Sequence, residues 1–266
     1  MPGKLTGQIA VVTGAGRGFG QAIAKGLAAE GASVAVTART PEQLQETVDA
    51  IQGAGGRAIS VPGDVTSRED VQRLRQETER QFGPATLVVH NAGVPWPFGP
   101  AWYVDPDEWW TAQGVHVRGA MLCINAFVPT MIENGGGRVI VISSTASQAV
   151  RPNLSGYAVA KYAQNRLVEH LAAEGREHNI FAWALHPGSV FTGISVETIS
   201  SPDAQKYLPE FTARLHTQRA SDDPSIGLNA CAAFCVRLAS GEGDTLSGRY
   251  LEPTWDLAEL ARTAGE

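Results

Sequence analysis

The chain has 266 residues, a formal net charge of −6 and 43% hydrophobic residues. No Pro/Ser-rich linker divides it, so we expect one domain over residues 1–266. The negative charge and the lack of basic runs argue against nucleic acid or an anionic membrane as a partner. No apolar stretch approaches the roughly 20 residues of a membrane span, and the N-terminus lacks the apolar segment of a signal peptide. The cytoplasm is therefore the expected location.

Short apolar runs alternate with helical patterns, which predicts a parallel sheet covered by helices on both faces. The expected strands are near residues 8–13, 33–37, 57–61, 86–90, 138–143, 180–186 and 248–251. Capping signals predict helix starts at Ser67, at Asp105 and at Thr40, where Gln43 would complete a capping box. Gly31 is expected to end the first helix as its C′ residue.

The cysteines are sparse and odd in number, at Cys123, Cys231 and Cys235. Such a set does not build a disulfide framework. Cys231 and Cys235 share a helix face but have no histidine or carboxylate nearby in the sequence. We expect buried thiols and no metal site.

A glycine-rich turn follows the first expected strand. It has the pattern T-G-x-x-x-G-x-G, at Thr13, Gly14, Gly18 and Gly20, and an apolar helical pattern resumes at Ile23. Glycines adopt positive φ and let the backbone approach phosphates closely. A strand, a glycine-rich turn and a helix together favour binding of a diphosphate at the helix N-terminus.

Tyr157 and Lys161 are four residues apart, and Ser144 lies thirteen positions before the tyrosine. Residues at this spacing share one helix face. Attraction to the ammonium favours the phenolate, so we expect the pKa of Tyr157 to fall from about 10 toward neutral pH. A pKa in that range suits general acid/base catalysis. Taken alone, the pair also fits an amphipathic helix with a surface lysine.

Two segments fit neither a strand nor a single helix. The first is aromatic and proline-rich, at about residues 94–104, and the second covers about residues 192–221. Both follow expected strand ends, and ligands of open α/β sheets bind outside the carboxyl ends of the strands. We therefore expect a substrate loop and a lid. The alternatives are a structural loop and an interface segment.

These motifs together resemble the short-chain dehydrogenase/reductase family. Further matches are Asp64, the run Asn91-Ala92-Gly93, and Pro187-Gly188 with Thr192. The resemblance covers about residues 5–252. It implies an α/β fold of the Rossmann type: a doubly wound, parallel, seven-stranded sheet in the order 3-2-1-4-5-6-7, with helices on both faces.

The resemblance also implies a nicotinamide cofactor. NAD-preferring members usually have an acidic residue at the position of Ala38, whereas here Arg39 follows and Arg17 lies inside the glycine turn. Guanidinium groups suit phosphate oxygens, so we expect NADP(H), although each arginine taken singly also fits a solvated surface residue. The cofactor-binding residues that the resemblance implies are Gly14, Gly16, Arg17, Gly18, Phe19, Gly20, Arg39, Asp64, Val65, Asn91, Ala92, Gly93, Tyr157, Lys161, Pro187, Gly188, Val190 and Thr192.

The implied reaction is reversible hydride transfer between the nicotinamide and a ketone or secondary alcohol. Tyr157 would exchange the proton, Lys161 would lower its pKa and hold the ribose hydroxyls, and Ser144 would bind the substrate oxygen. Ser143 is a neighbouring alternative to Ser144. The expected substrate-pocket residues are Trp96, Phe98, Gln148 and Asn153, and the aromatic loop also brings Trp102 and Tyr103.

His116 is the departure from the family pattern, because it aligns with an expected asparagine. That asparagine kinks its helix and supports a water chain from the lysine. Histidine can also donate and accept hydrogen bonds. We therefore include His116 in the candidate catalytic set, with a buried structural role as the equal alternative.

This departure keeps a second function class open, an NADP(H)-binding sensor or regulator with an altered catalytic set. A phosphate-transferring enzyme is disfavoured, because no Lys-Ser/Thr pair follows the glycines. The expected partner is a small carbonyl or alcohol. The resemblance further implies a homo-oligomer, a tetramer or a dimer.

Overall fold

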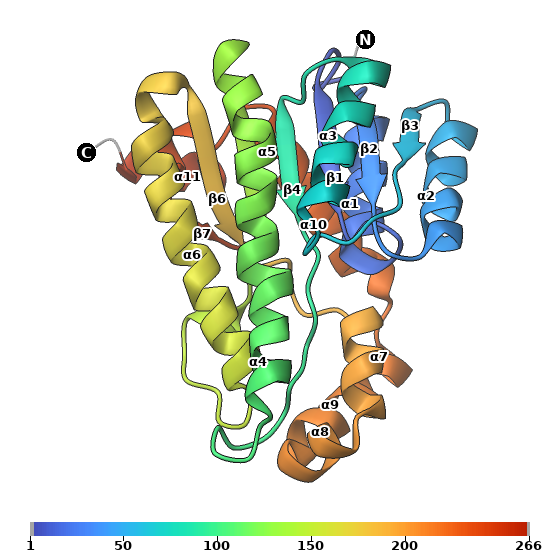
Figure 1. Ribbon diagram of the computed structural model, residues 1–266, viewed down its shortest axis with the longest axis vertical. Helices are drawn as coiled ribbons and strands as arrows, with labels where there is room; N and C mark the ends of the chain where they lie inside the picture. Colours follow the sequence, from blue (N-terminus) through green and yellow to red (C-terminus); the bar gives the residue numbers. More distant parts are fainter. Residues whose placement is uncertain (1–2, 265–266) are drawn as a thin grey trace.

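The computed structural model describes residues 3–264 and centres on a parallel sheet of seven strands (Figure 1). The strand order is β3-β2-β1-β4-β5-β6-β7. The strands are β1 (Ile9–Thr13), β2 (Ser33–Thr37), β3 (Arg57–Ser60), β4 (Leu87–His90), β5 (Gly137–Ile142), β6 (Ile180–Leu185) and β7 (Tyr250–Leu251). The expected strands, their order and the doubly wound Rossmann-type fold are confirmed.

Helices cover both faces of the sheet, because successive strand residues point to opposite sides. Val12 and Val34 pack in the core on one side, and Val11 and Ala35 pack in the core on the other. The first core is completed by α1 (Gly18–Ala29), α2 (Pro41–Gly53), α10 (Pro224–Ala239) and α11 (Leu257–Ala264). The second is completed by α3 (Arg68–Phe82), α5 (Gly119–Glu133) and α6 (Ser155–Gly175). The three cysteines are free and buried in these cores, as expected.

The helix ends follow the capping signals with one exception. The side chains of Ser67 and Asp105 accept hydrogen bonds from backbone N–H groups in the first turns of α3 and α4 (Pro106–Gln113). Gly31 has φ +94° and ends α1 with its backbone N–H bonded to a carbonyl of the last turn, as a C′ glycine does. The capping box at Thr40 was predicted wrongly. Thr40 occupies the N-cap position, but its side chain makes no capping hydrogen bond, and Pro41 begins the helix.

One long helix crosses the sheet, built from α4, the π-helical turn η1 (Gly114–Arg118) and α5. An 18-residue window of this helix has a mean hydropathy of 1.3, so by length and composition it could cross a membrane. The expectation that no apolar stretch approaches this length was therefore wrong. Half of that window is buried, and the buried α5 side chains pack with β4, β5 and α3 in the second core. A core helix has this apolar character because it covers the centre of the sheet.

The carboxyl edge of the sheet carries the irregular segments. The predicted lid is helical, as α7 (Gly193–Ser200), α8 (Pro202–Tyr207) and α9 (Pro209–Ser221), and forms a separate lobe below the sheet in Figure 1. Short 3-10 turns are η2 (Thr145–Ser147), η3 (Arg176–His178) and η4 (Asp244–Leu246). The candidate site lies between this lobe and the sheet edge.

Candidate active site

A cleft of about 250 Å³ opens at the carboxyl edge of the sheet. Predicted cofactor residues in its wall are Gly14, Gly16, Arg17, Gly18, Phe19, Arg39, Asp64, Val65, Asn91, Ala92, Gly93 and Thr192. Gly20 packs beneath the glycine turn, while Pro187, Gly188 and Val190 lie between β6 and α7. The tertiary structure therefore brings most of the predicted set into one cleft.

The glycine turn forms the floor of this cleft. Gly14 and Gly18 have φ of +64° and +58°, which favours glycine at both positions. A Cβ atom on Gly20 would lie 2.3 Å from the Gly14 carbonyl oxygen, so only glycine fits there. Asn91, after β4, donates its amide to the carbonyls of Thr13 and Gly14 at 3.0 and 3.1 Å. The N-terminus of α1 thus faces the cleft, an arrangement that fits a diphosphate.

The end of the cleft that is expected to hold adenosine has four charged side chains in its wall: Arg17, Arg39, Asp64 and Glu197. Arg39 is exposed beside the half-buried Ala38, and no ion pair of Arg39 is found among the described residues. Arg17 instead forms an ion pair with Glu197 of α7. Asp64 accepts two hydrogen bonds from Thr66 at 2.8 Å through Oδ1, and these bonds stabilise the turn that follows Asp64.

Ser144, Tyr157 and Lys161 meet beyond the other end of the cleft. Ser144 follows β5, and Tyr157 and Lys161 lie one turn apart on α6. The Lys161 Nζ atom is 5.5 Å from the centroid of the Tyr157 ring. Val94 belongs to the cleft wall, and its backbone contacts the His116 ring that packs on Tyr157.

The two candidate serines differ in their surroundings. Ser143 is buried, and its hydroxyl donates to Asn165 Oδ1 at 2.6 Å. Ser144 is half-buried, and its hydrogen bonding with Tyr157 lowers the pKa of that phenol. The geometry therefore favours Ser144 over Ser143 as the residue beside the tyrosine.

Burial controls the charges of this group. It lowers the pKa of Lys161 to about 7 and raises the pKa of Tyr157, with only a partial counter-effect from Ser144. The expectation that the pKa of Tyr157 is lowered was therefore wrong, because burial raises it. The reason is that the same desolvation disfavours both the phenolate and the ammonium, and a partly neutral amine stabilises the phenolate weakly.

Lys161 is held by two acceptors. Its side chain is almost fully buried, and Nζ donates to the Ile142 carbonyl at 2.6 Å and to Gln164 Oε1 at 3.0 Å. Gln164 Nε2 donates in turn to the main-chain carbonyl of His116 at 2.8 Å. The link from the lysine therefore reaches the backbone of His116, not its ring.

The His116 ring contacts a different segment. Its Nε2 atom lies 2.8 Å from the carbonyl oxygen and 3.2 Å from the amide nitrogen of Val94, and no hydrogen bond joins the ring to Lys161 among the described residues. Burial, followed by the nearby Lys161 charge, holds the pKa of His116 well below 6.5, so the ring is neutral at neutral pH. A relay role for the ring stays a prediction.

The predicted substrate residues lie at three places. Phe98 is buried and Trp96 half-buried, whereas Trp102 and Tyr103 are 79% and 75% exposed. Asn153 donates its amide to the Tyr207 carbonyl at 2.9 Å, which connects the loop before α6 to the lid.

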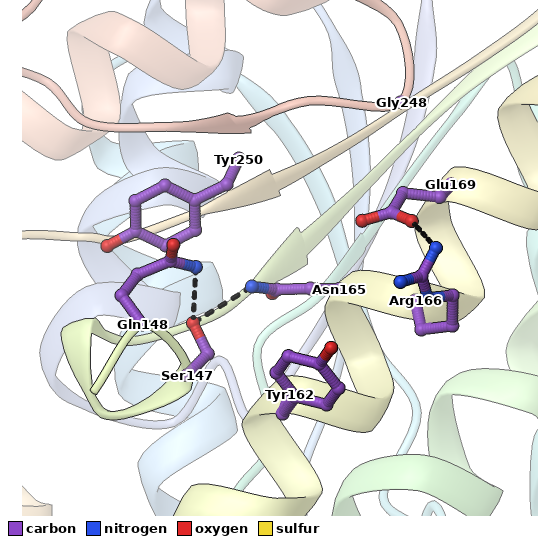
Figure 2. Close-up of a pocket in the computed structure, with 8 residues that line it drawn as sticks. All are labelled: Ser147, Gln148, Tyr162, Asn165, Arg166, Glu169, Gly248 and Tyr250. Carbon is purple, nitrogen blue, oxygen red and sulfur yellow. Dashed lines mark hydrogen bonds and ion pairs between the residues drawn. The ribbon is translucent and has the colours of Figure 1, made fainter. Parts of the chain in front are cut away.

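Gln148 lies in a second pocket of about 240 Å³ between α6 and β7 (Figure 2). Figure 2 shows its amide bonded to Ser147, which also accepts a hydrogen bond from Asn165. The cleft at the carboxyl edge of the sheet has a different lining, so Gln148 and that cleft belong to separate cavities.

Two functional candidates were missed by the sequence reasoning. Glu197 lines the cleft and pairs with Arg17. Gln164 contacts Lys161, and its helical spacing of three residues from the lysine is a signal that could have found it.

The fold and the cleft together define a dinucleotide-binding protein of the Rossmann type, with a Ser, Tyr and Lys group beside the binding cleft. The family model for short chain dehydrogenases matches residues 8–202. The chain therefore belongs to the short chain dehydrogenase family, whose members are oxidoreductases that use a nicotinamide cofactor.

Individual relatives agree with this assignment. A short chain dehydrogenase of Pseudocercospora fijiensis is 32% identical, with 98% of this chain and 85% of the relative covered. An uncharacterized NAD-dependent oxidoreductase of Mycobacterium tuberculosis is 36% identical, with 71% and 74% covered. A crystal structure of a gluconate 5-dehydrogenase from Burkholderia cenocepacia with NADP and tartrate is 26% identical, with a TM-score of 0.78 and 93% and 94% covered.

Proposed function

We propose that the chain is an NADP(H)-dependent oxidoreductase that transfers a hydride between the nicotinamide and a ketone or secondary alcohol, with Tyr157 as the acid/base. The observation that carries this proposal is the continuity of the site. The cleft that fits a dinucleotide reaches Val94, and the His116 ring connects Val94 to Tyr157. A bound cofactor there would supply the hydride.

The chain's own residues would handle the proton. Burial raises the pKa of Tyr157, so its hydroxyl is protonated at neutral pH and can donate a proton to a forming alkoxide. Ser144 would orient the substrate oxygen by hydrogen bonding. Lys161 would place a positive charge beside the phenol at the moment when Tyr157 becomes negative.

The preference for NADP(H) is argued from the adenosine end. Ala38 offers no carboxylate to repel a 2′-phosphate, and Arg39 stands at the cleft wall. Arg17 is within the same cleft but is paired with Glu197. Related proteins include a NAD-dependent oxidoreductase and a structure with NADP. Family membership therefore does not indicate which cofactor is preferred, and the preference for NADP(H) is inferred from these residues.

The experiment is a turnover assay on a panel of ketones and secondary alcohols, read by nicotinamide absorbance. Tyr157→Phe is expected to lower turnover by about 10²–10⁴-fold while NADPH binding, read by fluorescence, is retained. Tyr162→Phe is the matched control, because Tyr162 is on the same helix but 58% exposed. Equal rates for wild type and Tyr157→Phe would refute the catalytic assignment.

The alternative, a sensor, predicts another pattern: NADPH binds, and no member of the panel is converted by the wild-type protein.

Self-association is also proposed, since apolar side chains on α5 and α6 face solvent. Met121, Val159 and Tyr162 are 47%, 48% and 58% exposed. Light scattering in solution tests this, and a monomer at all concentrations would contradict it.

A further inference from the structure

Gln164 uses both ends of its side-chain amide in the buried space between α6 and η1. The residue is fully buried, with Oε1 accepting from Lys161 Nζ at 3.0 Å and Nε2 donating to the His116 carbonyl at 2.8 Å. An amide that is bonded at both its oxygen and its nitrogen has one favoured orientation, because reversing it would set a donor against the ammonium. Gln164 is thus a rigid link between the lysine and the opposite helix.

The backbone of η1 makes this link possible. A π-helical turn departs from the i→i+4 pairing of an α-helix, and such turns are frequent at functional sites. His116 lies inside the turn, and its carbonyl accepts the Gln164 amide. The lysine is consequently tied to η1 through protein atoms alone.

Few groups surround Lys161 to stabilise its charge. The groups that face it are the Ile142 carbonyl of β5, the Gln164 oxygen, the Tyr157 ring and the neutral rings of His90 and His116. No carboxylate contributes to the pKa of Lys161, which burial alone lowers to about 7. The amide oxygen of Gln164 is therefore one of two acceptors for the ammonium.

We propose that Gln164 is a positioning residue that fixes the Lys161 ammonium beside Tyr157 and favours its charged form. The proposal rests on the proposed function for its catalytic consequence, but the contact itself is independent of any substrate. If the Gln164 oxygen favours the ammonium, removing it lowers the pH at which Lys161 loses its proton. A carboxylate at the same position raises that pH.

A simple packing role for Gln164 is the competing explanation, and the structure contains a matched example of one. Gln113, at the end of α4, is also buried and donates its Nε2 to the Gly156 carbonyl at 2.8 Å. It joins the same two helices in the opposite direction and makes no hydrogen bond to Lys161. Gln113→Leu therefore reports the cost of losing an interhelical amide bond alone.

The direct experiment is an NMR pH titration of protein labelled with 13Cε-lysine. Lys161 is readily separated, because the other lysines are Lys4, Lys25 and Lys206. Gln164→Leu is expected to move the Lys161 titration about one pH unit down, the size of one charge-assisted hydrogen bond. Gln164→Glu is expected to move it upward, and it tests the idea if the leucine variant does not fold.

The activity experiment uses the same variants. The fall of turnover at alkaline pH should shift down in Gln164→Leu, shift up in Gln164→Glu, and stay in place in Gln113→Leu. An unmoved Lys161 titration in both Gln164 variants, or an equal shift in Gln113→Leu, would overturn the proposal. Absent turnover in the wild type would refute the proposed function, while the NMR titration would still decide the role of Gln164.

Discussion

The imidazole ring of His116 lies edge-on against the phenol ring of Tyr157, with centroids 5.5 Å apart and an interplanar angle of 80°. The side chain and the main chain of His116 make separate contacts. Its ring packs on Tyr157 and bonds to Val94 in the cleft wall, whereas its main-chain carbonyl receives Gln164. A substitution at this position changes the contacts of the ring and leaves the hydrogen bond to the main-chain carbonyl in place.

His116→Leu is therefore expected to affect stability more than turnover. The loss of a buried hydrogen bond to Val94 should lower the free energy of unfolding by about 1–3 kcal/mol, while the main-chain carbonyl still accepts Gln164. His116→Asn is expected to be tolerated better, because an amide can still bond to the backbone. Thermal melting and turnover of both variants test this. A stable His116→Leu protein that has lost most of its turnover would instead place the ring in a proton relay.

Cofactor preference is expected to depend on Arg39. Wild-type protein should bind NADPH at least tenfold tighter than NADH, a difference of about 1.4 kcal/mol, and Arg39→Ala should remove most of this difference. Dissociation constants from nicotinamide fluorescence give the ratio directly. Equal constants for the two cofactors in the wild type would contradict the prediction.

The Arg17–Glu197 ion pair leads to a separate prediction. Both side chains are partly exposed, so the pair itself should contribute little to stability. Glu197→Gln frees the Arg17 guanidinium within the cleft and should increase the preference for NADPH over NADH, with an almost unchanged melting temperature. A lower NADPH preference in this variant would show that the pair, and not the free arginine, shapes the phosphate site.

Acid is expected to destabilise the fold through its buried histidines. Burial lowers the pKa of His90 from 6.5 to about 3, and the pKa of His116 is also well below 6.5. At a pH below 6.5 but above the pKa of each folded-state histidine, the unfolded chain binds protons that the folded chain excludes. The free energy of unfolding should therefore fall by about 1.4 kcal/mol per pH unit for each histidine as the pH drops below 6.5. Melting curves from pH 7 to 4 should show a smaller slope for His90→Asn, and identical slopes would contradict this account.

Gly20→Ala is expected to abolish tight cofactor binding. The added Cβ would lie 2.3 Å from the Gly14 carbonyl oxygen, so the glycine turn must move. Gly53→Ala is the control, because an added Cβ there meets no atom within 4 Å and alanine favours a helix by roughly 0.5–1 kcal/mol. NADPH titrations of both proteins, with melting temperatures, separate loss of the turn from loss of the fold. Normal NADPH affinity in Gly20→Ala would contradict this role of the turn.

Local patterns in the sequence were enough to predict the framework. The apolar runs predicted all seven strands, because a parallel strand covered on both faces needs apolar residues at successive positions. The glycine turn was equally readable, since Gly14 and Gly18 adopt backbone angles that favour glycine. The charge states of the site residues were harder to predict from the sequence. The direction of the Tyr157 pKa shift was predicted wrongly, because spacing reveals a neighbouring lysine but not the depth at which both groups are buried.

The sequence by itself therefore determined the sheet, its order through family resemblance, and many of the residues that line the cleft. Only the tertiary structure decided the contacts within the site. Arg17 meets Glu197 from 180 residues away, and Gln164 meets the His116 carbonyl from 48 residues away. Such contacts depend on how two packed helices or a lid are placed in space, and no local periodicity encodes that placement. The lysine's fixed position beside Tyr157 is a property of the packed fold.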